Sequence, residues 1–325
     1  MLPAFSYIRP GTVEEAIKQF SGEGAMLHAG GTDLMGCLRD GVFTARTLVS
    51  INGLQGLRSI KQTSDGGLLI GALTTVREVA ESPSLLQHYR ALAEGAAEVA
   101  SPQLRNQGTI GGNLCQRPRC WYYRGEFRCL KKGGDLCYAV GGESHYHCIF
   151  GGDPCFIVHP SDTAPALVAL DASARVAGPK GQRIVPLEKF FVLPGQHLER
   201  ETVLEPGEIL TEILLPPPVP GLRTSYRKVR ARRSWDFALA GVALALGFQG
   251  DRVTQARVVL SGAAPIPWRS KEVEEVLMGR SLDAETVAQA GEAVVKGARP
   301  LRHNGYKIPL FRGLVQEALL GVATT

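Results

Sequence analysis

Leu27-His28-Ala29-Gly30-Gly31-Thr32-Asp33-Leu34 places two glycines between an apolar, strand-like run and a helical run. Glycines in such a turn let backbone amides approach an anion, and the N-terminus of the following helix adds a favourable partial charge. The spacing matches neither GxGxxG nor GxxxxGK[ST], so neither a Rossmann site nor a Walker loop is supported. Taken alone, the segment is as typical of an ordinary left-handed turn as of a phosphate site.

A second glycine turn, Thr109-Ile110-Gly111-Gly112-Asn113-Leu114, lies some 75 residues further along the chain. We interpret both segments as strand-to-turn motifs, each with a hydroxyl side chain and a short polar residue beside its glycine pair. Two such turns could hold the pyrophosphate of a dinucleotide from two sides.

The sequence around these turns predicts a mixed α and β protein. Thr12 and Glu15 have the spacing of a helical capping box. Strand patterns occur at 5–8, 25–29, 49–51, 67–73, 164–170, 174–176, 209–215, 225–229 and 257–260, with a strongly apolar run at 237–248. Helical patterns begin after Thr12 and at Asp33, and others occupy 85–100, 271–278, 284–298 and 310–320.

The chain of 325 residues is too long for one ordinary core. We expect a small α/β part of the first domain at 1–57, a larger α+β part at 58–218, and a C-terminal α+β domain at 219–325. The proline-rich run 216–220 punctuates the second boundary.

The composition excludes several classes of protein. A net charge of +5 comes from scattered basic residues, which does not favour nucleic-acid binding. No apolar stretch reaches the roughly 18 residues of a membrane-spanning helix, and the N-terminus does not resemble a signal peptide. We therefore expect a cytoplasmic protein that contacts neither nucleic acid nor membrane.

Six of the seven cysteines fall within 41 residues, whereas Cys37 lies apart on a helical pattern and is expected in the core. An odd number of cysteines without a signal peptide argues against a disulfide framework. The segment 116–154 lacks periodicity, and a loop of that length needs a ligand to order it. Basic neighbours such as Arg119, Arg128 and Lys131 would help to keep thiols ionised, so a metal site is predicted.

The motifs AGGTDL, TIGGN and HPSDTAPAL, in this order, resemble the FAD-binding subunit of the xanthine dehydrogenase and carbon monoxide dehydrogenase family. The stretches 207–210 and 226–230 and the C-terminal pattern extend the resemblance nearly end to end. It implies the vanillyl-alcohol-oxidase-type (PCMH) FAD-binding fold, which is α+β, followed by an α+β C-terminal domain.

The resemblance also implies roles for individual residues. One turn would wrap the pyrophosphate of FAD, the second would continue that cradle, and Asp162 would accept a hydrogen bond from the cofactor. Leu210 would pack near the isoalloxazine and Lys228 would reach its polar edge, although a solvated strand-end charge is the alternative for Lys228. The residues of the two turns are Leu27, His28, Ala29, Gly30, Gly31, Thr32, Asp33 and Leu34, and Thr109, Gly111, Gly112 and Asn113.

The inserted segment after TIGGN resembles the loop of 4-hydroxybenzoyl-CoA reductase and of some bacterial aldehyde oxidoreductases, where it binds a [4Fe-4S] cluster. The match selects Cys120, Cys129, Cys137 and Cys155 as ligands. Their spacings of eight, seven and seventeen residues lack the CxxC pairs of most structural zinc sites. The cysteines left over are expected to pack against the flavin turn (Cys115) and to be small buried side chains (Cys148). His145 and His147 could ligate a metal, although ordinary loop histidines are commoner.

The resemblance implies an electron-transfer subunit with FAD and a [4Fe-4S] cluster. The chain lacks the plant-type CxxxxCxxC motif and anything like a molybdopterin-binding subunit, so both must come from partners. We expect a molybdopterin-binding large subunit and a [2Fe-2S] small subunit, in a dimer of heterotrimers, with ferredoxin or NAD(H) as the soluble carrier.

The nearest resemblance among such complexes is to 4-hydroxybenzoyl-CoA reductase, through NLCQ, Arg119-Cys120 and CLK at 129–131. The segment between Cys137 and Cys155 is closer in shape to the aldehyde oxidoreductase version. An aldehyde oxidoreductase or xanthine dehydrogenase is therefore the alternative, and a stand-alone flavin oxidase or a zinc-stapled assembly protein is an alternative of another class.

Overall fold

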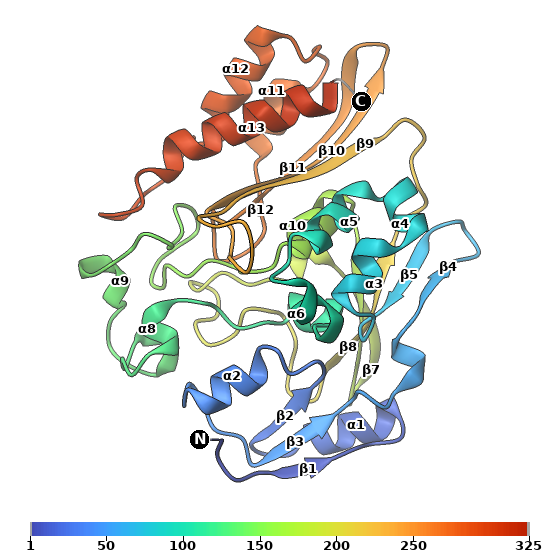
Figure 1. Cartoon of the computed structure of the whole chain (residues 1–325), viewed down its shortest axis with the longest axis vertical. Helices are drawn as coiled ribbons and strands as arrows, with labels where there is room; N and C mark the ends of the chain where they lie inside the picture. Colours follow the sequence, from blue (N-terminus) through green and yellow to red (C-terminus); the bar gives the residue numbers. More distant parts are fainter. Residues whose placement is uncertain (1, 324–325) are drawn as a thin grey trace.

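A computed structural model describes residues 2–323, whose N-terminal end forms a three-stranded parallel sheet of order β1-β3-β2 (Figure 1). The Thr12 hydroxyl accepts a hydrogen bond from the Glu15 amide at 3.1 Å, which starts the first helix. The glycine turn after the second strand lies at the carboxyl edge of this sheet, where ligands of open parallel sheets bind. The elements are β1 (Ser6–Ile8), α1 (Val13–Phe20), β2 (Ala25–His28), α2 (Leu34–Arg39), β3 (Thr47–Ser50) and η1 (Gln55–Leu57).

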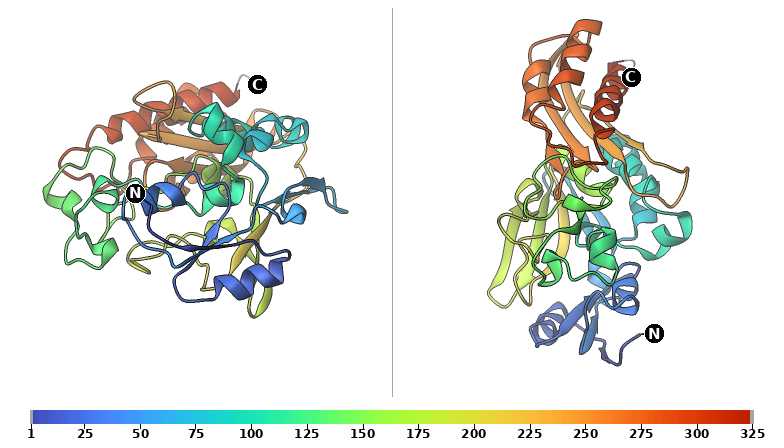
Figure 2. Two further views of the ribbon diagram at one scale, coloured as in Figure 1. Left: turned by 60° about the horizontal axis from the view of Figure 1, so that its bottom comes forward. Right: turned by 90° about the vertical axis from the view of Figure 1, so that its left-hand side faces the viewer.

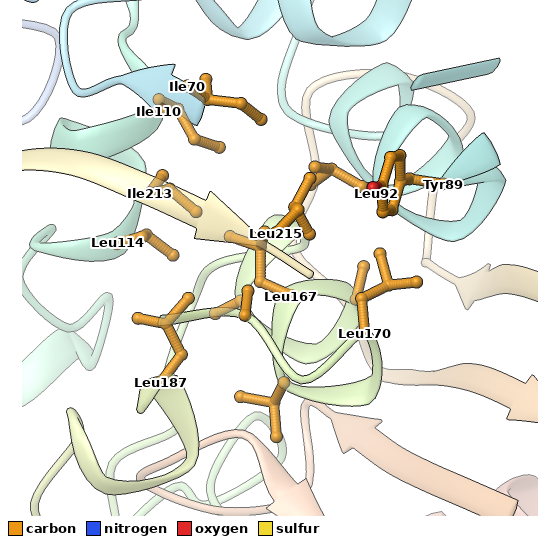
Figure 3. Packing of buried hydrophobic residues seen from close by; sticks show 14 of the residues in the cluster. Ile70, Tyr89, Leu92, Ile110, Leu114, Leu167, Leu170, Leu187, Ile213 and Leu215 are labelled. Atoms are coloured by element: carbon orange, nitrogen blue, oxygen red, sulfur yellow. The ribbon is translucent and has the colours of Figure 1, made fainter. Parts of the chain in front are cut away.

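The middle of the chain forms a five-stranded antiparallel sheet of order β4-β5-β8-β6-β7. Its strands are β4 (Ile60–Gln62), β5 (Leu68–Gly71), β6 (Ser173–Gly178), β7 (Gly181–Pro186) and β8 (Ile209–Leu215). Its helices are α3 (Val76–Glu81), α4 (Pro83–His88), α5 (Arg90–Ala97), α6 (Pro102–Gln107), α7 (Ile110–Leu114), α10 (Thr163–Ala169) and η3 (Leu187–Lys189). Figure 3 shows how Ile70, Ile213 and Leu215 of the sheet meet Leu92 and Leu167 of the helices in the main core.

The C-terminal domain is a four-stranded antiparallel sheet covered on one face by three helices (Figure 2). Along its central strand, Val242 and Leu244 face the helices, whereas Ala243 and Ala245 face the main core. This alternation follows the two-residue period of a strand and joins the two domains through one sheet. The elements are β9 (Arg223–Val229), β10 (Ala240–Gln249), β11 (Arg252–Ser261), β12 (Trp268–Arg269), α11 (Lys271–Leu277), α12 (Ala284–Ala293) and α13 (Lys307–Ala323).

The cysteine-rich segment projects to one side of the molecule, shown in green in Figure 1. Its regular structure is limited to the short helices α8 (Trp121–Arg124), η2 (Leu130–Lys132) and α9 (Tyr138–Gly141). Within residues 2–323, no helix is both long and apolar enough to cross a membrane.

The predicted α+β class is confirmed, but three local predictions are wrong. Residues 164–170 form the helix α10 rather than a strand, because a helix buried on every side also reads as an unbroken apolar run. Residues 85–100 form two helices, α4 and α5, which meet at Tyr89. The second glycine turn is the helix α7, with Thr109 as its N-cap, and α6 precedes it in a region that lacks a clear pattern.

Candidate functional site

The first glycine turn touches the residues that lead directly into the second one. A Cβ atom added to Gly30 would lie 2.0 Å from the carbonyl oxygen of Gln107, two residues before Thr109, so only glycine allows this approach. Gly31 has a φ of +72°, a conformation that other residues rarely adopt. The structure thus brings segments about 75 residues apart in sequence close together, and their joint binding of a dinucleotide stays a prediction.

The first turn presents unused hydrogen-bond donors. Within residues 2–323, no protein acceptor takes the backbone N–H of Gly30, Gly31 or Thr32. The neighbouring Ala29 carbonyl is held by the side chain of Asn52 at 2.8 Å. Three consecutive free amides beside the start of α2 form a suitable site for an anion.

The second turn has its backbone amides satisfied but leaves open space. The Gly111 amide donates to Ala72, and a Cβ at Gly111 would lie 2.8 Å from that residue. A Cβ at Gly112 would meet the Thr109 hydroxyl at 3.0 Å, and the described residues place no other atom within 4 Å beyond its chain neighbours and its own helix backbone. Asn113 Oδ1 accepts from Ser161 and Thr163 at 2.6 and 2.7 Å, which leaves its NH₂ group as the donor for a ligand.

Asp162 and Lys228 form a buried ion pair between the two domains. Their side chains are 4% and 0% exposed, and Lys228 Nζ lies 2.8 Å from Asp162 Oδ2. Lys228 also donates to the carbonyls of Glu98 and Asp236, while Tyr226 donates to Asp162 Oδ1 at 2.8 Å. Burial raises the pKa of Asp162, although the charge of Lys228 and the hydrogen bonds from Lys228 and Tyr226 lower it. All three N–H donors of Lys228 are used, so the expected contact with the flavin edge stays a prediction. The alternative of a solvated charge does not fit.

Two further residues of the predicted FAD site, His28 and Leu210, lie on strands of the first domain. His28, at the end of β2, has its Nδ1 3.4 Å from the Ser50 hydroxyl. Leu210 lies in β8 opposite Val176, buried in the main core. Its packing against an isoalloxazine also stays a prediction.

Asp33 connects the first glycine turn to the cysteine loop. Its Oδ1 accepts from Arg124 at 2.7 Å and lies 2.9 Å from Arg119 Nη1, and its Oδ2 accepts the Arg117 amide at 2.7 Å. Arg124 also donates to the buried Cys37. This link was not predicted, since nothing in the sequence pattern pairs Asp33 with arginines over 80 residues away. The loop is therefore held directly against the turn.

The four predicted cysteine ligands line one small void in the loop. Tyr122, Tyr123 and Tyr138 complete its walls, together with Leu130, Lys131 and Ile157. Cys120 also lines a separate cavity of about 270 Å³, which reaches His159 and Phe237. Cys148 is buried, as expected. Cys115 is partly buried and packs against the main core, and its expected contact with the flavin stays a prediction.

The thiols of this void do not have the environment of free cysteines. A hydrogen bond between Cys137 and Cys155 lowers the pKa of Cys137 to about 6 and raises that of Cys155. Burial raises the pKa of Cys120 to about 11, and its sulfur lies 3.3 Å from Nε2 of the buried His147. A positive metal core would favour the ionised form of thiols such as Cys120 and Cys155.

The basic residues expected around the thiols have three different surroundings. Lys131 is buried and pairs with Glu201 at 2.6 Å, and its charge lowers the pKa of Cys155 against the larger effects that raise it. Arg119 instead pairs with Asp33, and Arg128 is exposed. Glu201, a residue that the sequence analysis did not single out, also binds Arg117 at 2.7 Å.

Comparison with known proteins agrees with this geometry. The family described as the FAD binding domain in molybdopterin dehydrogenase matches residues 3–218, and the CO dehydrogenase flavoprotein C-terminal domain matches residues 224–322. The chain belongs to this family of FAD-binding subunits.

Relatives match this FAD-binding subunit over nearly its whole length. The aldehyde oxidoreductase FAD-binding subunit PaoB of Escherichia coli is 36% identical, over 98% of both chains. The carbon monoxide dehydrogenase medium chain of Hydrogenophaga pseudoflava is 29% identical, over 98% of this chain and 96% of that protein. A solved carbon monoxide dehydrogenase from the same organism superimposes with a TM-score of 0.78 at 28% identity, over 100% of this chain and 98% of the other.

The residues of this FAD-binding subunit suit both groups expected from sequence. The free amides of the first turn suit a pyrophosphate, and the missing Cβ at Gly112 keeps space open in front of the second turn. Four thiols around one void suit a metal cluster. Among the described residues, the one group of three ligand atoms within 4.8 Å of one another lies elsewhere, so the cysteines are more widely spread than ligands of a single zinc ion.

Proposed function

We propose that the chain is the FAD-binding electron-transfer subunit of a molybdenum hydroxylase of the aldehyde oxidoreductase type, carrying an additional [4Fe-4S] cluster. The close approach of Gly30 to the residues that lead into the second turn, with three free amides beside it, carries the proposal. When bound, FAD and the cluster would exchange electrons with an external carrier and with the partner subunits.

In this proposal, the first turn binds the pyrophosphate through the amides of Gly30, Gly31 and Thr32. The other residues that shape that turn are Leu27, His28, Ala29, Asp33 and Leu34. The opposite side of the pyrophosphate is covered by the second turn, through Thr109, Gly111, Gly112 and Asn113. Asp162 and Leu210 contact the far end of the cofactor. Because the donors of Lys228 are all occupied, we assign it to positioning Asp162, whose oxygens retain free lone pairs.

Cys120, Cys129, Cys137 and Cys155 are the proposed ligands of the [4Fe-4S] cluster. Their shared void, its tyrosine walls and the spread of the sulfurs support a polynuclear cluster over a zinc ion. Asp33 belongs to the first glycine turn, and it would fix the distance from this turn to the cluster loop because its carboxylate binds Arg117, Arg119 and Arg124 of the loop.

The identity of the complex rests on similarity. The relative that is 36% identical is an aldehyde oxidoreductase subunit, which favours this alternative over 4-hydroxybenzoyl-CoA reductase. We propose a molybdopterin-binding large subunit and a [2Fe-2S] small subunit as partners. The dimer of heterotrimers, the carrier (ferredoxin or NAD(H)) and a cytoplasmic location stay predictions.

The alternatives of another class have less support. A stand-alone flavin oxidase would need its own substrate cap, whereas residues 224–322 match the flavoprotein C-terminal domain of CO dehydrogenase. A zinc-stapled assembly protein would need closely grouped cysteine ligands.

Affinity purification of the chain from its own host, without oxygen, tests the proposal. Co-purification of FAD with a molybdenum-containing subunit and a [2Fe-2S] subunit is expected, together with aldehyde oxidation. Recovery of the chain alone, with flavin that oxidises a substrate directly, would favour the flavin oxidase.

A further inference from the structure

Glu143, His145 and His303 form a cluster outside the flavin turns and the cysteine void. Glu143 Oε2 lies 2.9 Å from His145 Nδ1 and 3.7 Å from His303 Nδ1. The three ligand atoms lie within 4.8 Å of one another. Two imidazole nitrogens and one carboxylate oxygen are a ligand set typical of zinc.

The spacing of these atoms suits a tetrahedral ion. Bonds of about 2.0–2.1 Å to nitrogen and oxygen place neighbouring ligand atoms roughly 3.3 Å apart, between the two separations observed here. The imidazole centroids are 5.2 Å apart with nearly parallel planes, so one ring must turn about its Cβ–Cγ bond before both nitrogens point at one ion.

The buried nitrogen Nδ1 of His303 gives a second indication that a ligand binds here. This nitrogen is buried and makes no hydrogen bond with the described residues, and its ring is 26% exposed. A buried polar atom without a hydrogen bond is costly unless a ligand satisfies it. A metal ion between the two rings would remove that cost.

The backbone around the cluster is fixed before any ion binds. The His303 amide donates to the Ser144 hydroxyl at 3.1 Å, and the Tyr306 hydroxyl donates to the His145 carbonyl at 2.8 Å. The Asn304 side chain donates to the carbonyls of His147 and Cys148. These bonds hold the cysteine loop against the start of α13, so ligands from distant segments already lie close together.

We propose that Glu143, His145 and His303 bind a divalent transition-metal ion, with zinc as the expected ion. The ion would tie the cysteine loop to the C-terminal domain. Glu143 and His145 also line the 270 Å³ cavity, so a remaining coordination position would face that cavity and accept water or a small anion.

Zinc titration of the FAD- and iron-loaded complex tests this site, with bound zinc measured by mass spectrometry after gel filtration. His303→Ala should weaken zinc binding by roughly tenfold or more. Glu143→Gln, a substitution at an exposed position that retains the shape of the side chain, should also weaken it. His88→Ala, at an exposed histidine on α4, is the matched control and should bind zinc like the wild type.

Equal zinc affinity in the wild type, His303→Ala and Glu143→Gln would overturn the proposal, since zinc would then bind elsewhere, including the thiols. Anomalous diffraction at the zinc edge gives an independent readout that does not require the variants to fold. A peak within about 2.0–2.2 Å of all three ligand atoms is expected. A peak only at the cysteines would reject the site.

Discussion

Replacing Lys228 by Met should destabilise the protein strongly, because it leaves the Asp162 carboxylate buried without its counter-ion. Both side chains are almost fully buried, and Lys228 supplies three hydrogen bonds, two of them to the backbone of other segments. Removing one partner of a buried pair costs about 3–5 kcal/mol. At about 2–4 °C per kcal/mol for domains of 150–250 residues, the melting temperature should fall by roughly 10 °C.

Differential scanning calorimetry at pH 7 measures this effect, with Arg77→Met as the matched control. Arg77 pairs with Glu81 at 2.9 Å, but both side chains are more than half exposed, so its loss should cost less than about 1 kcal/mol. The double variant Lys228→Met with Asp162→Asn should recover part of the stability, because no unpaired charge remains. Equal costs for Lys228→Met and Arg77→Met, or additive effects at 228 and 162, would refute the buried pair.

Three further predictions address the cofactors and the pH response. Cys129→Ser should lose the broad iron-sulfur absorbance and keep FAD, and full retention of iron would reject Cys129 as a ligand. Gly112→Val should expel FAD from the purified chain, whereas Gly53→Ala, where a Cβ meets no atom within 4 Å, should retain it; flavin retained by Gly112→Val would make that turn merely structural. Burial lowers the pKa of His159 to about 4 from an ordinary 6.5, so the unfolded chain binds this proton first as the pH falls. Stability should therefore decrease between about pH 6.5 and pH 4 by up to about 3 kcal/mol, and urea titrations of His159→Phe should show a correspondingly smaller loss.

The sequence predicted those parts of the fold that depend on local chemistry. The capping residue Thr12 and the strands β8 and β9 appear where expected, since short-range hydrogen bonds and runs of strand-forming residues determine them. The strand predicted at 164–170 is wrong, because burial on all sides removes the polar face that distinguishes a helix from a strand. The α7 helix was missed because a run containing two glycines has weak intrinsic helix propensity.

The candidate site was predictable where one motif contains it and not where distant segments meet. The glycine turns can be recognised from their own residues, and the family resemblance selected the cysteines that line one void. The bonds from Asp33 to Arg119 and Arg124, and the pairing of Lys131 with Glu201, depend on tertiary contacts. No spacing rule in a single sequence reports such contacts. The pairing of Lys228 with Asp162 likewise required the docking of β9 on the first domain.

Native mass spectrometry of the chain, released without oxygen from its purified complex, tests the central claim most directly. We expect one species that carries FAD and a four-iron, four-sulfide cluster, and a Cys155→Ser variant that carries FAD alone. A chain that carries FAD with zinc, or with no metal on its cysteines, would contradict the cluster. A chain that carries the cluster without FAD would contradict the assignment of the glycine turns.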